Sequence, residues 1–321
     1  MVAIETPHET GPIARRPARR RAGTQTIRDS GWSRLTPYLL VLPVLVLMLL
    51  FIYWPLVYSF YLATLEWNFV SPTRTFVGLH NFTALATDKN FRTALGNTGL
   101  YLLVLVPVQV LLPLAFAVLL GAIVRSRAQT AYRAVLFTPT VMALPVAAVC
   151  WLWIFNPIQG VLNKLLFLVG GSRVSWLTDP KVAIWCIITV AIWKALGFNL
   201  LLYLAALEAV PPEYLEAAAL DGAGGWALFW RIKWPLITPT FFFVLVTTVI
   251  FINDEAFAAI NVLTDGGPFQ HTTNVLYYLY ERGFRFFQVG QASAVSVLVV
   301  LAVMTLTWLQ FRFVEGRVYY A

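Results

Sequence analysis

Long apolar runs alternate with shorter polar segments along nearly the whole chain after residue 35. An α-helix needs about 20 consecutive, mostly apolar residues to cross the hydrocarbon core of a bilayer. The runs lie at about residues 37–62, 97–124, 134–155, 181–207, 236–263 and 289–314. The pattern predicts an all-α, polytopic membrane protein with six transmembrane helices in a domain that covers residues 35–321.

Composition supports the same class of protein. Of the 321 residues, 59% are hydrophobic and 12% are charged, and the mean hydropathy is +0.73. Soluble domains have about 25% charged residues. Cys150 and Cys186 both lie in apolar runs, and we interpret them as small buried residues rather than a disulfide. The three histidines are scattered along the chain, so the sequence predicts no metal site.

The first 34 residues differ from the rest because they are polar and contain seven arginines. With so few apolar side chains, this segment is predicted to be a disordered tail. The polar lead and the apolar run that follows it are both too long for a cleaved signal peptide. The net charge of the chain is +8, and arginines are concentrated in this segment, which favours a cytoplasmic leaflet over nucleic acid as the neighbour.

The distribution of basic residues also sets the expected orientation. Cytoplasmic loops of membrane proteins are enriched in Lys and Arg. With six spans, both termini lie on one side, and that side carries the arginine-rich tail and the basic 125–133 loop. The sequence therefore predicts that the N-terminus, the C-terminus and residues 208–235 are cytoplasmic.

Residues 208–235 form a long, acid-rich interruption between the fourth and fifth apolar runs. Pro211 and Pro212 prevent the preceding helix from continuing, because proline lacks an N–H and clashes with the previous turn. The following residues, 213–221, are strong helix formers, and Gly222 is placed to end that helix. A second short helix is predicted over 226–234, up to Pro235. The segment thus predicts a helix, a glycine turn and a helix outside the hydrocarbon.

The side chains of this segment favour a docking surface. Small residues let another surface approach the backbone closely, and two acids supply charge beside them; these are Ala217, Ala218, Ala219, Gly222, Glu216 and Asp221. Trp226, Trp230 and Trp234 recur every four residues and therefore share one helix face, as is typical at a membrane–water interface. The alternative is an interfacial loop helix with no partner.

Several of these residues resemble the EAA motif of permease subunits of bacterial ABC importers. They are Glu216-Ala217-Ala218, Asp221-Gly222-Ala223, Ile232 and Pro235. In that family the motif forms a cytoplasmic coupling helix that fits into a cleft on the ATP-hydrolysing subunit. The resemblance implies that Glu216, Ala217, Ala218, Asp221, Gly222 and Ala223 couple this chain to an ATPase. Trp234 departs from the family, which usually carries leucine before the proline.

Polar residues inside the predicted spans are the candidates for a solute pathway. A charge at mid-bilayer is costly and usually marks a pathway or a structural pair. The residues are Lys194 and Asn199 in the fourth span, and Asn253, Asp254, Glu255 and Asn261 in the fifth. They either line a polar cavity or serve helix packing, with Lys194 in a buried ion pair with Asp254 or Glu255 and amides such as Asn199 bonded between helices.

Other segments resemble particular branches of the family. The Thr264 to Pro268 turn resembles the carbohydrate-uptake (MalF-like) permeases. Further stretches resemble the UgpA-type permeases for glycerol-3-phosphate or glycerophosphodiesters; they are Phe155-Asn156-Pro157, Trp193-Lys194 with Asn199, Glu216 to Ala223, and Gln310 to Glu315 with Val318 and Tyr320. This likeness implies a carbohydrate or glycerol-phosphate solute, with a disaccharide or amino sugar as the alternative. For a phosphate-bearing solute, Lys194 would be a reasonable counter-charge.

The resemblance also implies the partners. They are a second, homologous permease subunit, two ATPase subunits and an extracytoplasmic solute-binding protein, assembled in the bacterial cytoplasmic membrane. The chain has no G-x-x-x-x-G-K-[ST] motif and no Ser/His/Asp or Cys/His set arranged for catalysis, so ATP and its magnesium ion are expected on the partner. The sequence thus predicts a transport subunit without cofactors or catalytic residues.

Two alternatives of other classes use the same residues differently. An ion-coupled secondary transporter would use Lys194, Asp254 and Glu255 and would need no ATPase. A membrane scaffold without transport would tolerate the loss of these charges and of Glu216. Neither alternative explains the acid–alanine–glycine segment between the fourth and fifth spans.

Overall fold

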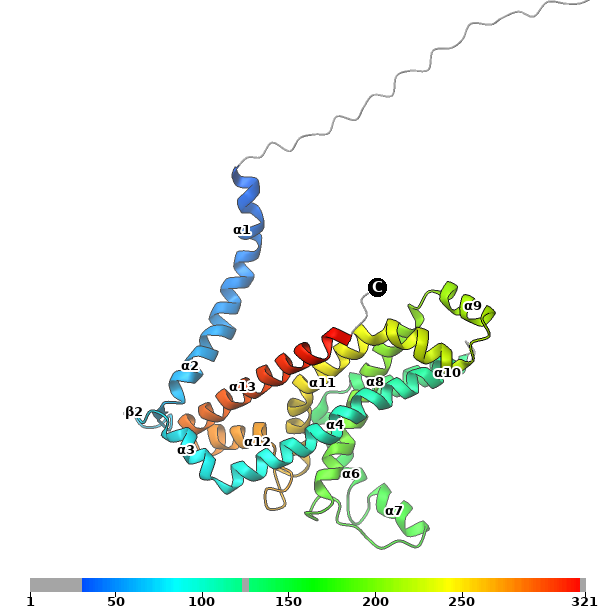
Figure 1. The fold of residues 1–321 in the computed structure, drawn as a ribbon. Coiled ribbons are helices and arrows are strands. Elements are labelled where there is room, and N and C mark those ends of the chain that lie inside the picture. The colour runs from blue at the N-terminus through cyan, green and yellow to red at the C-terminus, as the bar shows by residue number, and fades with distance from the viewer. Residues whose placement is uncertain (1–30, 123–126, 318–321) are drawn as a thin grey trace, which may run out of the picture. The chain divides into compact units, whose positions relative to one another are not determined.

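The computed structural model describes residues 31–122 and 127–317, and these are almost entirely helical (Figure 1). The chain divides into two compact units, Met1–Trp54 and Pro55–Ala321. Five described helical stretches are long and apolar enough to cross a membrane, and a bent pair of helices makes a sixth. The all-α polytopic fold is therefore confirmed.

A helical stretch long and apolar enough for the first predicted span covers Thr36–Leu62. It consists of α1 (Gly31–Met48), the π-helical segment η1 (Leu49–Tyr53) and α2 (Trp54–Leu62). The π-turn lies just before Pro55, and the Trp54 N–H donates to the Leu49 carbonyl. A wider turn relieves the clash that proline causes in a regular helix. Only the last four residues of the predicted tail fall among the described residues, and they begin α1.

Three helices form the centre of the Pro55–Ala321 unit. They are α4 (Lys89–Ala122), α8 (Ala183–Glu208) and α11 (Trp234–Leu263), and they pack against one another. Their contact surfaces bury two clusters of aliphatic and aromatic side chains. These helices are long and apolar enough for the second, fourth and fifth predicted spans, although α4 begins eight residues earlier than predicted. α13 (Val289–Phe313) is the candidate for the sixth span.

The third predicted span is wrong as a single straight helix. The structure has α5 (Arg127–Val141) and α6 (Leu144–Ile154), which meet at 107°. Ala143 between them is extended, with φ −61° and ψ 135°. Pro145 in the first turn of α6 suits a helix start rather than a helix interior. The apolar run is thus long enough for one span but is folded as two helices.

The segments predicted as loops contain short elements. After the first span, β1 (Leu65–Glu66) pairs antiparallel with β2 (Thr75–Phe76), and α3 (His80–Thr87) follows. The segment after α6 contains α7 (Val161–Leu168), and the segment before α13 contains α12 (Val275–Tyr280) and η3 (Glu281–Arg285). The described chain ends with η4 (Glu315–Arg317).

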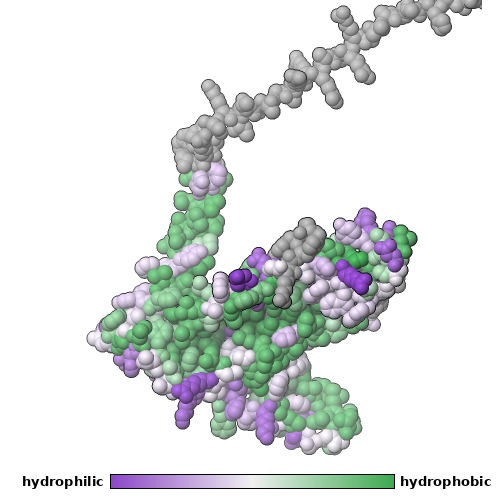
Figure 2. Space-filling view, viewed as in Figure 1, coloured by the Kyte–Doolittle hydropathy of each residue, from purple (hydrophilic) through white to green (hydrophobic). Residues whose placement is uncertain are grey.

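The segment between spans four and five contains α9 (Pro212–Leu220), α10 (Gly225–Leu228) and the π-helical η2 (Phe229–Lys233). The second short helix does not end at Pro235 as predicted. It continues into α11 as one apolar stretch, Gly225–Leu263, because the π-turn of η2 accommodates the proline. Figure 2 shows hydrophobic surface over the body of the Pro55–Ala321 unit and hydrophilic residues gathered around α9.

Candidate coupling and pathway sites

Residues 208–235, called the coupling segment here after the role that the resemblance implies, fold as two helices around a glycine turn. α9 begins at Pro212, a first-turn position where the missing N–H is not needed, and Glu213 lies beside the positive end of the helix dipole. Gly222 ends the helix with φ +73°, a conformation that residues with a Cβ rarely adopt. The Ala223 N–H donates to the Ala218 carbonyl at 2.9 Å and closes the C-terminus. The glycine stop is where the sequence predicted it.

A groove of about 740 Å³ lies between α9 and the helix that follows it. Five of the six motif residues line it, together with side chains from the second helix: Ala217, Ala218, Asp221, Gly222, Ala223, Ala227, Arg231 and Ile232. Glu216 is exposed beside the groove, and Leu220 at the end of α9 is 91% exposed. The motif residues therefore meet on one accessible surface with small side chains.

The three tryptophans of the second helix share one face, as predicted. Trp226 and Trp230 have ring centroids 5.6 Å apart, and so do Trp230 and Trp234. The row continues to Phe241 on α11, whose ring centroid lies 5.0 Å from that of Trp234. Trp226 is 77% exposed. This row joins the coupling segment to the fifth span through continuous aromatic contacts.

An ion pair anchors the start of the coupling segment. Arg133 of α5 donates to the carboxylate of Glu208, the last residue of α8. Sequence reasoning did not single out either side chain, because they are 75 residues apart in the chain. The pair connects the bent α5–α6 element to the end of α8 from which the coupling segment departs.

Lys194 binds the end of a helix. Its Nζ donates to the carbonyls of Pro139, Thr140 and Met142 at 2.9, 2.7 and 2.5 Å. These carbonyls lie at the C-terminus of α5, where the helix has no further N–H groups to offer. A lysine ammonium has three donors, and all three are used here. Gly197 on the same helix lets α5 approach, because a Cβ there would lie 2.4 Å from the Leu136 carbonyl oxygen.

The predicted ion pair of Lys194 with Asp254 or Glu255 does not form among the described residues. Glu255 instead accepts a hydrogen bond of 2.9 Å from Gln109 of α4. The same Gln109 amide donates to the Ala191 carbonyl of α8 at 3.1 Å, and Asn199 donates to the Gln109 carbonyl at 2.8 Å. Asn199 thus bonds between helices, and Gln109, which the sequence analysis missed, connects α4, α8 and α11.

Two pathway candidates on α11 face away from the rest of the bundle. Asp254 and Asn261 are exposed, and their spacing of seven residues places them on one helix face with the 54% exposed Phe251. Asn253 is half-buried, its Oδ1 has no hydrogen-bond partner, and its backbone carbonyl accepts from Asn274 at 3.1 Å. A carboxylate at this depth needs water or a partner rather than lipid.

The ends of α11 and α12 are joined by a second polar network. Asp265 accepts from Tyr277 at 2.8 Å and from Arg285 at 2.5 Å. The hydrogen bond from the Arg285 guanidinium is the main reason that the pKa of Asp265 lies below its usual value. Arg282 pairs with Asp88 at 2.7 Å and ties η3 to the start of α4. Among the described residues, no group of three or more His, Cys, Asp or Glu side chains could hold a metal ion.

These features define a class of protein: a helical membrane protein whose spans four and five are separated by a polar helix–turn–helix with an accessible small-residue groove. The model of the family described as "Binding-protein-dependent transport system inner membrane component" matches residues 88–318, and the chain belongs to this family. It is a permease subunit of an ABC importer and not itself an enzyme. The ion-coupled transporter and the scaffold are therefore set aside.

Individual relatives are similar in sequence to this chain over most of its length. The chain is 35% identical to the sn-glycerol-3-phosphate transport system permease protein UgpA of Agrobacterium fabrum, covering 90% of this chain and 97% of the relative. The Brucella abortus protein of the same name is 36% identical over 90% and 98%.

Solved structures show the same fold. A chain of a bacterial ABC transporter that imports the acidic polysaccharide alginate superposes with a TM-score of 0.77 at 25% identity, covering 89% of this chain and 98% of that one. A chain of the alginate transporter in complex with an alginate pentasaccharide-bound periplasmic protein gives 0.76 at 24% identity, covering 88% and 96%.

Proposed function

We propose that this chain forms half of the translocation pathway for a small, hydroxyl-bearing solute of the carbohydrate or glycerol-phosphate class. The similar UgpA proteins are named for sn-glycerol-3-phosphate, and the similar structures come from an alginate importer. Both solutes are hydrophilic and rich in oxygen. A disaccharide or amino sugar is the second candidate within the same class.

The groove between α9 and the second helix is the observation that carries the coupling role. It gathers Ala217, Ala218, Asp221, Gly222 and Ala223 on an accessible surface at the end of the bundle. Such a surface suits a partner that approaches the backbone closely, with Glu216 offering a charge at its edge. We assign the partner as an ATPase subunit, and with a second permease chain the importer holds two ATPase subunits. ATP and magnesium bind there, and this chain needs no cofactor of its own.

The exposed face of α11 is proposed to line the pathway. Asp254 and Asn261 lie on that face, and Asn253 and Glu255 lie behind it. The second, homologous permease subunit would supply the opposite wall, because a polar face of this kind is not stable against lipid. Lys194 is assigned to packing, since its three donors are used by backbone carbonyls at the end of α5 and just after it. It is not proposed as the counter-charge for a phosphate.

The orientation and the remaining partner follow from charge and from the coupling role. The arginine-rich tail and the 125–133 loop favour a cytoplasmic N-terminus and C-terminus, and the coupling segment then lies on the side where ATP is present. An extracytoplasmic solute-binding protein would dock on the opposite side and deliver solute. A periplasmic protein is present in one of the similar solved complexes.

ATPase stimulation in the co-expressed importer, reconstituted with its binding protein, tests the proposal. We would compare a glycerophosphodiester, sn-glycerol-3-phosphate, a disaccharide and an amino sugar. Stimulation by one class identifies the solute. Failure of an ATPase subunit to co-purify would contradict the coupling assignment. Stimulation by none of the four, with the complex assembled, would contradict the solute class.

A further inference from the structure

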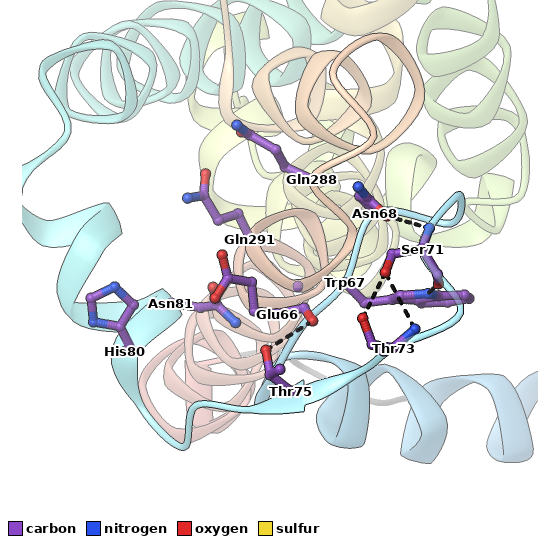
Figure 3. A pocket seen from close by; sticks show the side chains of 11 residues that line it. Glu66, Trp67, Asn68, Ser71, Thr73, Thr75, His80, Asn81, Gln288 and Gln291 are labelled. Carbon is purple, nitrogen blue, oxygen red and sulfur yellow. Dashed lines mark hydrogen bonds between the residues drawn. The ribbon is translucent and has the colours of Figure 1, made fainter.

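We infer that the pocket between the β1–β2 hairpin, α3 and the start of α13 is a binding site for a neutral, hydroxyl-rich group, such as a glycosyl or glycerol unit. The pocket has a volume of about 450 Å³ (Figure 3). It is lined almost entirely by polar residues from three separate parts of the chain: Glu66, Trp67, Asn68, Ser71, Thr73, Thr75, His80, Asn81, Gln288, Gly290 and Gln291. The use of this pocket during solute import rests on the proposed function, whereas binding of the ligand itself does not.

Contacts between distant segments fix the base of the pocket. The buried Asn81 donates to the Ala63 and Leu65 carbonyls at 2.8 and 2.9 Å. The Val289 N–H donates to the Trp67 carbonyl at 3.0 Å, which places the N-terminus of α13 against the hairpin. A Cβ on Gly290 would lie 1.9 Å from the Leu65 carbonyl oxygen, so only glycine allows this approach. The pocket is therefore preorganised, which lowers the entropic cost of binding.

One wall of the pocket is formed by a turn that is stabilised by hydrogen bonds between its own residues. Asn68 accepts from the Ser71 N–H at 2.7 Å, and the hydroxyls of Ser71 and Thr73 lie 2.7 Å apart (Figure 3). Trp67 donates to the Ser71 carbonyl, and the Arg74 guanidinium covers its ring at 4.2 Å from the centroid. These hydrogen bonds and the ring contact maintain the shape of the wall.

The other side of the pocket carries groups that have no partner among the described residues. They are the Glu66 carboxylate, the His80 imidazole, the Gln291 amide and the Asn81 Oδ1, and Figure 3 shows them on the side of α3 and α13. The first-turn N–H groups of Gly290 and Gln291 also make no hydrogen bond there. The site thus offers both acceptors and donors around one cavity.

This mixture matches hydroxyl groups, because each hydroxyl both donates and accepts a hydrogen bond. The volume lies within the range of small-molecule sites. Glu66 is the only acid in the lining, and no Lys or Arg lines the pocket, so the carboxylate disfavours a phosphate or carboxylate and favours the neutral end of a solute. One carboxylate and one imidazole are too few ligands for a calcium ion, which takes six to eight oxygens.

Ligand-observed NMR on the full importer complex in nanodiscs tests this site without ATP or a binding protein. The probes are methyl α-glucoside, glycerol and sn-glycerol-3-phosphate. Saturation transfer to the C–H protons of the neutral probes is expected, with weaker transfer to the phosphate. Glu66→Gln should weaken binding about tenfold, because a hydrogen bond to a charged group is lost. Gln291→Ala should weaken it severalfold.

The matched control is Glu315→Gln, which removes an exposed carboxylate near the far end of α13. That helix has 25 residues, so its ends are about 37 Å apart. Unchanged saturation transfer is expected, and each variant must elute and melt like the parent complex. Equal binding by the Glu66→Gln and parent complexes, or preferential binding of the phosphate, would overturn the inference.

The outcome is separable from the proposed function. If neutral probes do not bind but the loaded binding protein still stimulates ATP hydrolysis, only the pocket inference fails. If they bind at this pocket but no solute stimulates the ATPase, the proposed function fails. A third outcome is that no probe binds the parent complex, while Glu66→Gln abolishes stimulation of the ATPase by the loaded binding protein. The pocket would then be a contact surface for that protein, and the inference would be overturned.

Discussion

At the hairpin end of the Pro55–Ala321 unit, the carbonyls of Ala63, Leu65 and Trp67 accept hydrogen bonds from other elements, α3 and the start of α13. At the α9 end, the described backbone hydrogen bonds around the Gly222 turn are local, and the motif residues are largely exposed. One end is therefore fixed by tertiary contacts, whereas the other presents a locally folded surface. Partner contacts are expected to complete that second surface.

The largest change in stability is expected from substitutions at two glycines, Gly290 and Gly96, which differ in their surroundings. Gly290→Ala should destabilise the protein by about 3 kcal/mol, because its Cβ would overlap the backbone of Leu65 and force the hairpin away. Thermal unfolding of the purified chain in one detergent measures the effect. Gly96→Ala is the matched control: it has no atom within 4 Å of the added Cβ and should be neutral or slightly stabilising. Equal melting of both variants would show that the hairpin is not fixed as described.

Gly222→Ala should act mainly on coupling. Its positive φ makes a Cβ unfavourable by about 1–2 kcal/mol, but no neighbouring atom lies within 4 Å. The fold should survive, while solute-stimulated ATP hydrolysis should fall more than tenfold because the groove changes shape. The measurement is ATPase stimulation next to a melting curve. Normal stimulation in this variant would separate the glycine turn from coupling.

Glu216→Ala should leave stability unchanged within about 0.5 kcal/mol, because the side chain is exposed. We expect stimulation of the ATPase to fall about fivefold through the loss of a charge at the edge of the groove. Glu213→Gln, an exposed acid in the first turn of the same helix, serves as the control. Similar losses in the two variants would indicate a general effect of charge rather than a contact made by Glu216.

The smallest expected effect is a pH dependence at the Asp265–Arg285 pair. The pKa of Asp265 is lowered in the folded protein, so the pair stabilises the fold above the unfolded pKa of about 3.9. That contribution is lost as the pH falls through the folded pKa. Because the carboxylate is 60% exposed, the effect should be below about 1 kcal/mol. Arg285→Gln should lower the melting temperature at pH 7 and match the parent near pH 2.

Prolines and a glycine explain why the helix and turn at the α9 end could be predicted from the sequence. Pro211, Pro212 and Gly222 act on neighbouring residues, so the helix and its turn could be located without tertiary information. The second helix was predicted to stop at Pro235 because a π-turn is a small adjustment that the residue pattern does not reveal. The same adjustment precedes Pro55 in the first span.

The polar residues of the bundle show more clearly what cannot be predicted from the sequence. Lys194 was recognisable as a charge in a span, but its partners are three carbonyls at the end of α5 and just after it, which are free to accept hydrogen bonds because the third span is broken there. Gln109 was not predicted as a site residue, because a single amide in an apolar run is common in packed membrane helices. Its importance comes from the place where α4, α8 and α11 meet.

Hydrophobic length and proline or glycine residues act over short stretches of chain. The residue pattern was therefore enough to predict the membrane class, the family resemblance, five of the helical spans and the helix–turn–helix of residues 208–235. The break between α5 and α6, the partners of Lys194 and the polar pocket at the hairpin could not be predicted in this way. Each of these depends on backbone carbonyls and side chains that are far apart in the chain and come together only when the helices pack.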